Sequence, residues 1–214
     1  MVRPGQGVRR EMQFDRSKLK AVILRTCKAC PPDRLGAVKL HKVLYFLDMI
    51  HYAQMGSAVT GATYRKRPFG PTCVPLLPVL AEMQNEGSIK VQDAEYYGLR
   101  KKEYIALAGA PAGVLNDSES ALLGDVIEFV CERNSAKSIS DYSHKLPWEM
   151  VDFGAEIPYS SALMLFPVDI SPEAFDAVEQ GAREVAQARF ESDPLAFPLL
   201  SDFRSRVLSQ IGQI

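Results

Sequence analysis

The sequence predicts a mainly α-helical domain that contains one small β-hairpin. Apolar residues recur at helical spacing in several long segments, and most of these segments begin at a capping residue or end at glycine or proline. Between two of the helices, residues 88–91 and 99–107 have the composition of short strands, joined by a turn within residues 93–98. Because a hairpin between helices is typical of winged modules, we expect a compact, winged-helix-like helical domain.

The first two helices are predicted to build the core. The first begins at Asp15, a capping residue, and ends at Cys30, just before two prolines. The second is predicted over residues 33–55 and is followed by Gly56, in the position of a left-handed cap. Its apolar residues cover more than one face, and such a helix is normally packed on more than one side. We therefore expect it to be the central helix.

The segment between the second helix and the hairpin is interrupted by prolines and glycines. Residues 59–67 indicate short extended structure, and residues 68–75 indicate a loop that leads into a third helix ending before Gly87. Pro78 lies in this helix, lacks an amide hydrogen and crowds the carbonyl four residues earlier. The third helix is therefore expected either to start late or to be kinked.

Three further helices are predicted after the hairpin. The fourth, within residues 116–134, has Asp117 or Ser118 as its cap. The fifth begins at Ser138, which has the capping-box spacing to Asp141. A C-terminal helix begins at Ser171 and continues to residue 190. The predicted organisation is a flexible N-terminus (1–13), a single helical domain (14–190) and a tail (191–214) that docks on the body or on a partner.

Composition and charge favour a globular cytoplasmic protein. The chain is 47% hydrophobic and its formal net charge is only -1, so no global field attracts nucleic acid or an anionic membrane. No run of about 18 apolar residues occurs, and the basic N-terminus is not followed by an apolar segment, so we predict no membrane association. Four scattered cysteines do not form a disulfide framework, and we expect free thiols.

The sequence has no pattern typical of an enzyme, so we predict no catalytic residue, no cofactor and no metal site. Cys27 and Cys30 have C-x-x-C spacing, but a zinc site needs four ligands and no second pair follows. The three histidines, His41, His51 and His144, are not spaced as ligand pairs. Ser143 and His144 are neighbours whose side chains diverge on a helix, and no nucleophile-elbow glycines accompany them. A hydrolase that uses His144 or the cysteines stays open as an alternative.

Two basic clusters support a different alternative, a winged DNA-binding transcriptional regulator that controls its own promoter. Residues 65–67 read Arg-Lys-Arg, and residues 100–102, on the predicted hairpin, read Arg-Lys-Lys. Such clusters on a wing can contact DNA phosphates. The near-neutral overall charge argues against this function, and no helix has the polar composition of a recognition helix.

The stretch from Leu40 to Pro71 resembles the signature of the Panacea domain, also called the SocA-like antitoxin domain. A lysine-bearing helix is followed by a glycine-containing turn and an aromatic-glycine-proline step, and a later histidine-tryptophan step is also similar. The matching residues are Leu40, Lys42, Leu44, Tyr45, Phe46 and Asp48; then Gly56, Gly61 and Tyr64; then Phe69, Gly70 and Pro71; and finally His144, Pro147 and Trp148. The similarity extends over residues 15–153.

This resemblance implies a mostly helical protein that acts without catalysis. Members of the family are antitoxins of bacterial and phage-associated toxin–antitoxin systems, and they neutralise a cognate protein toxin by direct complex formation. At least one branch is also an adaptor that delivers its toxin to a cellular protease. The partner implied here is a toxin encoded by an adjacent gene. The chain departs from the family pattern at Val43, where leucine is usual, and at Pro78, and the tail is not covered.

The predicted partner-binding residues combine the family motif with aromatic and basic side chains that suit recognition. They are Tyr45, Tyr64, Arg65, Arg67, Phe69 and Trp148. The motif residues predicted to have structural roles are Leu40, Lys42, Leu44, Phe46, Asp48, Gly61, Gly70, Pro71 and His144. The two glycines are expected at turns that need a positive φ or a close backbone approach. The helix is thus predicted as the core, and the loop that follows it as the binding rim.

Overall fold

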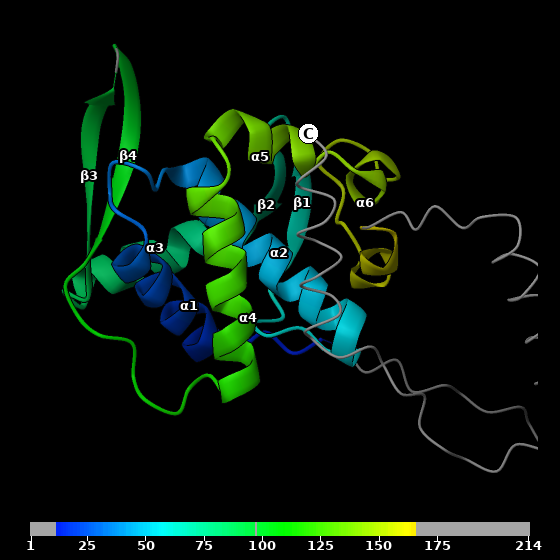
Figure 1. Ribbon diagram of the computed structural model, residues 1–214, viewed down its shortest axis with the longest axis horizontal. Helices are drawn as coiled ribbons and strands as arrows, with labels where there is room; N and C mark the ends of the chain where they lie inside the picture. Colours follow the sequence, from blue (N-terminus) through cyan, green and yellow to red (C-terminus); the bar gives the residue numbers. More distant parts are fainter. Residues whose placement is uncertain (1–11, 97, 166–214) are drawn as a thin grey trace, which may run out of the picture. The chain divides into compact units, whose positions relative to one another are not determined.

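The computed structural model describes residues 12–96 and 98–165 (Figure 1). Among the described residues, those up to Leu163 form a first compact unit, and Met164 and Leu165 belong to a second. The predicted C-terminal helix and the tail lie outside the described residues, as does most of the predicted flexible N-terminus. The domain prediction therefore stays a prediction.

The first unit is mainly helical with two small antiparallel sheets, as predicted for the fold class. Its helices are α1 (Arg16–Ala29), α2 (Ala37–Met55), α3 (Leu76–Asn85), α4 (Asp117–Ile127), α5 (Ala136–Tyr142) and α6 (Leu146–Glu149). A π-helical turn (Glu128–Glu132) continues α4, and a 3-10 helix covers Tyr159–Met164. The sheets pair β1 (Tyr64–Arg67) with β2 (Gly70–Cys73), and β3 (Ile89–Tyr96) with β4 (Leu99–Ala106).

Helix α2 is the central element, as its two-sided apolar pattern predicted. Twelve of its 19 residues are buried, and it packs against α1, α4, α5 and β2. Gly56 ends it with φ 68°, which confirms the predicted left-handed cap. Its predicted start at residue 33 was wrong, because the amides of Arg34 and Leu35 donate to the carbonyl of Pro31 and form a separate turn. The helix begins only after Gly36.

The predicted loop over residues 68–75 contains a strand instead. Residues 70–73 form β2, which pairs with β1 so that Tyr64 lies opposite Cys73 and Arg67 lies opposite Gly70. A four-residue strand with the sequence Gly-Pro-Thr-Cys has no apolar alternation, so the sequence pattern did not indicate it. Contacts with α2 hold this strand in place.

Helix α3 starts late, which is the first of the two outcomes predicted from its prolines. It begins at Leu76, so Pro78 lies in the first turn, where helical amides have no intrahelical partner. Gly87 follows with φ 69°. The β3–β4 hairpin then appears where it was predicted and extends beyond the helical body (Figure 1). The winged-helix likeness itself stays a prediction.

Two capping predictions in the second half were wrong by a few residues. Asn116, and neither Asp117 nor Ser118, caps α4, with Glu119 completing a reciprocal capping box. Ser135 caps α5 through Ser138, so Ser138 is inside the helix and is not its cap. In both cases a polar residue that precedes the predicted one takes the cap, which places the predicted residues in the first turn. Within residues 12–96 and 98–165, no helix is long and apolar enough to cross a membrane.

Gly61 is predicted to be essential for joining the N-terminal segment to the core. Its φ is +64°, and a Cβ atom there would lie 2.4 Å from the carbonyl oxygen of Gln13. We expect Gly61→Ala to lower the free energy of unfolding by about 3 kcal/mol, from left-handed strain plus steric overlap. Gly87→Ala is the matched control, since it has φ +69° with nothing within 4 Å of the Cβ position. Urea unfolding should give about 1 kcal/mol for this control, and equal losses would contradict the steric argument.

Candidate functional site

Lys42 is buried inside the domain and binds the turn between β1 and β2. Its side chain is on α2 and the residue is 1% exposed. The ammonium Nζ donates to the carbonyl oxygens of Phe69 at 2.6 Å and Pro71 at 3.0 Å. None of the described carboxylates forms an ion pair with it, and burial lowers its pKa to about 7. Lys42 therefore acts as a hydrogen-bond donor that fixes the backbone of the hairpin turn.

Gly70 lies between the two carbonyls that Lys42 binds, and no side chain fits there. Its φ is +87°, and a Cβ atom would lie 2.3 Å from the Ser143 Oγ and 2.7 Å from the Lys42 Nζ. Ser143, the C-terminal cap of α5, is itself buried and donates to the carbonyl of Ser140 at 2.6 Å. The hairpin turn, α2 and the end of α5 therefore meet at this glycine, as the prediction of a close backbone approach required.

Asp48, one and a half turns further along α2, organises a second buried polar cluster. Its carboxylate accepts hydrogen bonds from the amide and hydroxyl of Thr60, from the hydroxyl of Tyr64 at 2.8 Å and from the hydroxyl of Tyr159 at 3.1 Å. Burial raises the pKa of Asp48, and these hydrogen bonds oppose the shift. The Tyr159 hydroxyl also lies 2.7 Å from the carbonyl of Ala62. Asp48 thus ties α2 to the start of the hairpin and to the later 3-10 helix.

His41 makes a third connection between α2 and the hairpin. Its Nδ1 accepts a hydrogen bond from the amide of Cys73 at 3.1 Å. Burial, together with the nearby Lys42 cation, lowers the pKa of His41 to about 4, so the ring is neutral at physiological pH. A neutral imidazole can accept this bond, whereas a protonated one would lose it.

Two of the predicted partner-binding residues are in the core. Tyr45 is fully buried and Tyr64 is 1% exposed. Their rings pack edge to face with centroids 5.4 Å apart, and Tyr45 makes a similar contact with Phe46. Because both rings are buried, neither can contact a partner, and we withdraw both as partner-binding residues. The predicted structural residues Leu40, Leu44 and Phe46 are fully buried, which agrees with a core role.

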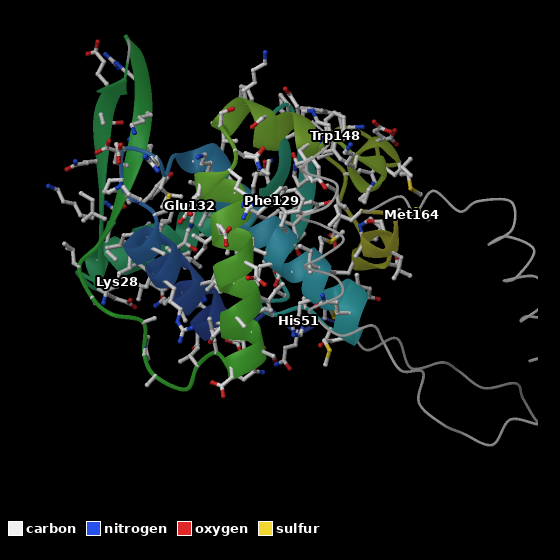
Figure 2. The ribbon with its side chains drawn as sticks, in the orientation of Figure 1. Lys28, His51, Phe129, Glu132, Trp148 and Met164 are labelled. Carbon is white, nitrogen blue, oxygen red and sulfur yellow. The ribbon has the colours of Figure 1, made fainter. Side chains whose placement is uncertain are left out.

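Of the two other predicted aromatic residues, Trp148 lies at the surface where α6 meets the β1–β2 hairpin (Figure 2). Its Nε1 donates to the carbonyl of Arg67 at 3.2 Å. The imidazole of His144 stacks on one side with ring centroids 4.1 Å apart, and the Lys66 ammonium lies 4.1 Å from the indole centroid. Lys66 also donates to the carbonyl of Val151 at 2.9 Å. Trp148 is therefore a fixed, partly exposed platform.

Exposed apolar side chains lie on the same elements, at the turn between β1 and β2, on α6 and in the segment that follows α6. Phe69 is 70% exposed at the hairpin turn, Phe153 is 63% exposed, and Met150 and Leu146 are also exposed. The guanidinium carbon of Arg67 lies 6.0 Å from the Phe153 ring. We call this region the hairpin–α6 surface, defined by Arg67, Phe69, Leu146, Trp148, Met150 and Phe153.

The backbone beneath this surface is held by an additional pairing. The amide of Lys66 donates to the carbonyl of Ala155 at 3.0 Å, and the amide of Gly154 donates back to the carbonyl of Lys66 at 3.0 Å. The amide of Ile157 donates to the carbonyl of Tyr64 at 2.8 Å. Residues 154–157 thus pair with the free edge of β1 and bring Phe153 beside Arg67. Sequence reasoning missed Met150, Phe153, Thr60 and Tyr159, because no local pattern in the sequence indicates which distant residues they contact.

The second predicted basic cluster is largely neutralised. On the β3–β4 hairpin, Lys102 forms an ion pair with Asp93 at 2.7 Å, and Lys101 forms one with Glu103 at 3.2 Å. Lys101 also donates to the carbonyl of Asp33 at 2.6 Å. The hairpin therefore does not present a concentrated positive field.

Side chains of the types used in catalysis have structural partners in this domain. Ser143 donates to a carbonyl, His41 accepts from an amide, and Lys42 donates to two carbonyls. Within the described part of the chain, no group of three or more His, Cys, Asp or Glu residues could hold a metal ion. The hairpin–α6 surface is open to solvent, and its aromatic, apolar and cationic groups suit binding.

Comparison with known proteins gives one match. The family model described as "Antitoxin SocA-like, Panacea domain" matches residues 40–149. This range contains α2, both hairpins, α4, α5 and α6. No curated protein matches the chain, and no solved structure matches it.

The buried ammonium of Lys42 predicts a specific pH dependence of stability. Its pKa is about 7 in the folded state and near 10.5 when unfolded, so the unfolded state binds more protons between these values. Stability should therefore rise with pH from 7 to 9 by about 2 to 3 kcal/mol relative to Lys42→Met, which cannot titrate. Urea unfolding of both proteins across this range measures the difference. Titrating groups that both proteins share contribute equally to the two free energies of unfolding. If the difference between these free energies does not change with pH, Lys42 is not buried as a titrating amine.

Proposed function

The chain belongs to the SocA-like antitoxin family with a Panacea domain, and from this membership we propose that it is a non-catalytic antitoxin that neutralises a cognate protein toxin by direct binding. The family supports the general antitoxin role. The observation that carries the mode of action is the hairpin–α6 surface, since it groups exposed aromatic, apolar and cationic side chains on a fixed backbone. Most of this surface lies inside the matched range.

The composition of the hairpin–α6 surface favours a protein partner. Tryptophan and arginine are enriched among residues that dominate binding energy, and Trp148 and Arg67 are adjacent here through the hydrogen bond between them. Phe69, Met150 and Phe153 present apolar area that is 59% to 70% exposed. Burying such side chains in a complex is favourable, at about 25 cal/mol per Å² of apolar surface before the costs of association.

The surface is also preorganised. Lys42 holds the turn that carries Phe69, and residues 154–157 hold the strand that carries Arg67. The indole of Trp148 is held by the stacked His144 ring and by the Lys66 ammonium. Because little backbone freedom remains to be lost on binding, more of the contact energy contributes to affinity. Arg65, which is exposed on β1, would lie at the rim, where charge mainly influences the association rate.

Delivery of the toxin to a protease is the second role that the family resemblance implies. It would require another surface that stays free while the hairpin–α6 surface is covered by the toxin. DNA binding is less well supported, because Lys101 and Lys102 on the β3–β4 hairpin form ion pairs with acidic residues. A protein that binds its own promoter through phosphate contacts would need unpaired cations on that wing.

We expect Phe69→Ala and Phe153→Ala each to weaken binding of the toxin encoded by the adjacent gene by at least tenfold, about 1.4 kcal/mol. Both side chains are mostly exposed, so folding should not change. Leu107→Ala is the matched control, because Leu107 is 60% exposed at the end of β4, away from α6. Calorimetric titration measures affinity, and co-expression with the toxin measures rescue of growth.

Two outcomes would contradict different parts of this proposal. If the wild-type chain rescues growth without forming a complex, direct neutralisation is wrong. If the complex forms but Leu107→Ala weakens it as much as Phe69→Ala and Phe153→Ala do, the antitoxin function stands and the assignment of the surface is wrong.

A further inference from the structure

The basic cluster at residues 65–67 is divided between the two faces of β1. Side chains alternate along a strand, so Tyr64 and Lys66 share one face, and Arg65 and Arg67 share the other. Tyr64 is buried and Lys66 is half-buried, whereas both arginines are exposed. The face with Tyr64 and Lys66 is therefore the inner face of the β1–β2 hairpin, and the two arginines define its outer face.

Lys66 is used inside the domain. Its ammonium donates to the carbonyl of Val151 at 2.9 Å and lies 3.5 Å from the carbonyl oxygen of Glu149, the last residue of α6. It also lies 4.1 Å from the centroid of the Trp148 ring. These contacts join β1 to α6 and to the segment after it. Lys66 is therefore a positioning residue for the side chain of Trp148.

The two arginines have no carboxylate partner in the domain. Within residues 12–96 and 98–165, no ion pair includes Arg65 or Arg67. Glu156 lies opposite Arg65 where residues 154–157 pair with β1, but these two side chains form no ion pair. Because alternate residues of a strand are about 6.6 Å apart, the outer face presents two guanidinium-bearing side chains at this spacing. Each can bind a carboxylate through two parallel hydrogen bonds.

Exposed apolar side chains lie at both ends of the outer face. Phe69, at the hairpin turn, is 70% exposed, and Val74, which directly follows β2, is 45% exposed. Leu77, in the first turn of α3, is 69% exposed. The outer face is thus open to solvent, and Phe69 makes it continuous with the hairpin–α6 surface.

Given the toxin binding proposed above, on which this inference rests, we propose that Arg65 and Arg67 bind carboxylates of an acidic patch on the toxin. The guanidinium carbon of Arg67 lies 6.0 Å from the ring of Phe153. A partner that covers this ring also removes water from a pair between Arg67 and a carboxylate, which strengthens the pair. Arg65 lies further from the turn, at the rim, where charge mainly raises the association rate.

Nucleic acid is the other macromolecule that exposed arginines bind, and the surroundings favour a protein. Because Lys66 is directed inward, only two cations of the cluster are on the outer face, and affinity for DNA grows with the number of phosphates neutralised. Glu149, Asp152 and Glu156 are exposed in the neighbouring segments. A protein surface can place cations opposite these carboxylates, whereas DNA presents phosphates along its whole length.

The test measures the kinetics with which the full-length chain binds the toxin encoded by the adjacent gene. Arg67→Glu should weaken the complex by at least about tenfold through faster dissociation, and Arg65→Glu should slow association by about tenfold. Arg100→Glu is the matched control, since it reverses an exposed arginine on the β3–β4 hairpin with the same change in net charge. Its affinity should stay within about twofold of wild type. Circular dichroism and urea unfolding check that all three variants fold.

Neutral substitutions separate charge from packing. Wild-type affinity should fall by about tenfold between about 50 mM and about 500 mM sodium chloride, and the double variant Arg65→Gln/Arg67→Gln should lose most of this dependence. Lys66→Met should shift the fluorescence of Trp148, the only tryptophan in the chain, and leave the salt dependence unchanged. If Lys66→Met reduces the salt dependence as much as the double variant does, the division of the cluster is wrong.

The remaining outcomes are distinguishable. If the wild-type chain forms no complex with the toxin, the proposed function is wrong and the acidic contact is wrong with it. If the complex forms but Arg65→Glu and Arg67→Glu weaken it no more than Arg100→Glu does, toxin binding stands and the acidic contact is wrong. A mobility-shift titration uses a duplex of the promoter DNA upstream of the gene. Specific binding that the same two variants abolish would assign the arginines to phosphates and overturn the proposal.

Discussion

Two buried ionisable side chains on a helix that is covered on several sides set the arrangement of the domain. Lys42 and Asp48 are both at most 1% exposed on α2, so their polar atoms must find partners within the protein. Asp48 binds Thr60, Tyr64 and Tyr159, and Lys42 binds the carbonyls of Phe69 and Pro71. The chain from Thr60 to Pro71 is therefore attached to α2 near both of its ends. An unpaired charge at either position would cost several kcal/mol, which makes these contacts obligatory.

This attachment explains how so small a sheet can be part of a rigid surface. The β1–β2 hairpin has four residues in each strand, too few to be stable alone. Lys42, His41 and the pairing with residues 154–157 supply the stability that the hairpin lacks. As a result, Arg67 and Phe69 project from a fixed backbone, beside a tryptophan that is itself stacked. The buried polar contacts of α2 therefore hold the same hairpin that carries the exposed binding side chains.

The same arrangement accounts for side chains whose pKa values would otherwise indicate catalysis. Strongly shifted lysine, histidine and aspartate residues often mark active sites. Here burial is the main cause at Lys42, His41 and Asp48, and each is occupied by backbone or hydroxyl groups that hold secondary structure together. The shifts therefore have a structural explanation. A surface made rigid in this way suits recognition, which needs shape more than chemical reactivity.

Local patterns in the sequence were sufficient to predict α1 to α5, apart from some of their first residues, the β3–β4 hairpin, the central place of α2 and the two glycine turns, because periodicity, caps and left-handed glycines act over a few residues. They could not locate β2, since a Gly-Pro-Thr-Cys strand exists only through its contacts with β1 and α2. They also placed Tyr45 and Tyr64 at a surface, because an aromatic motif does not say which side of a helix or strand is covered. The grouping of Phe153 with Arg67 and of Tyr159 with Asp48 joins residues 86 or more positions apart. Only tertiary packing decides such contacts, because their energy depends on which distant elements close over one another.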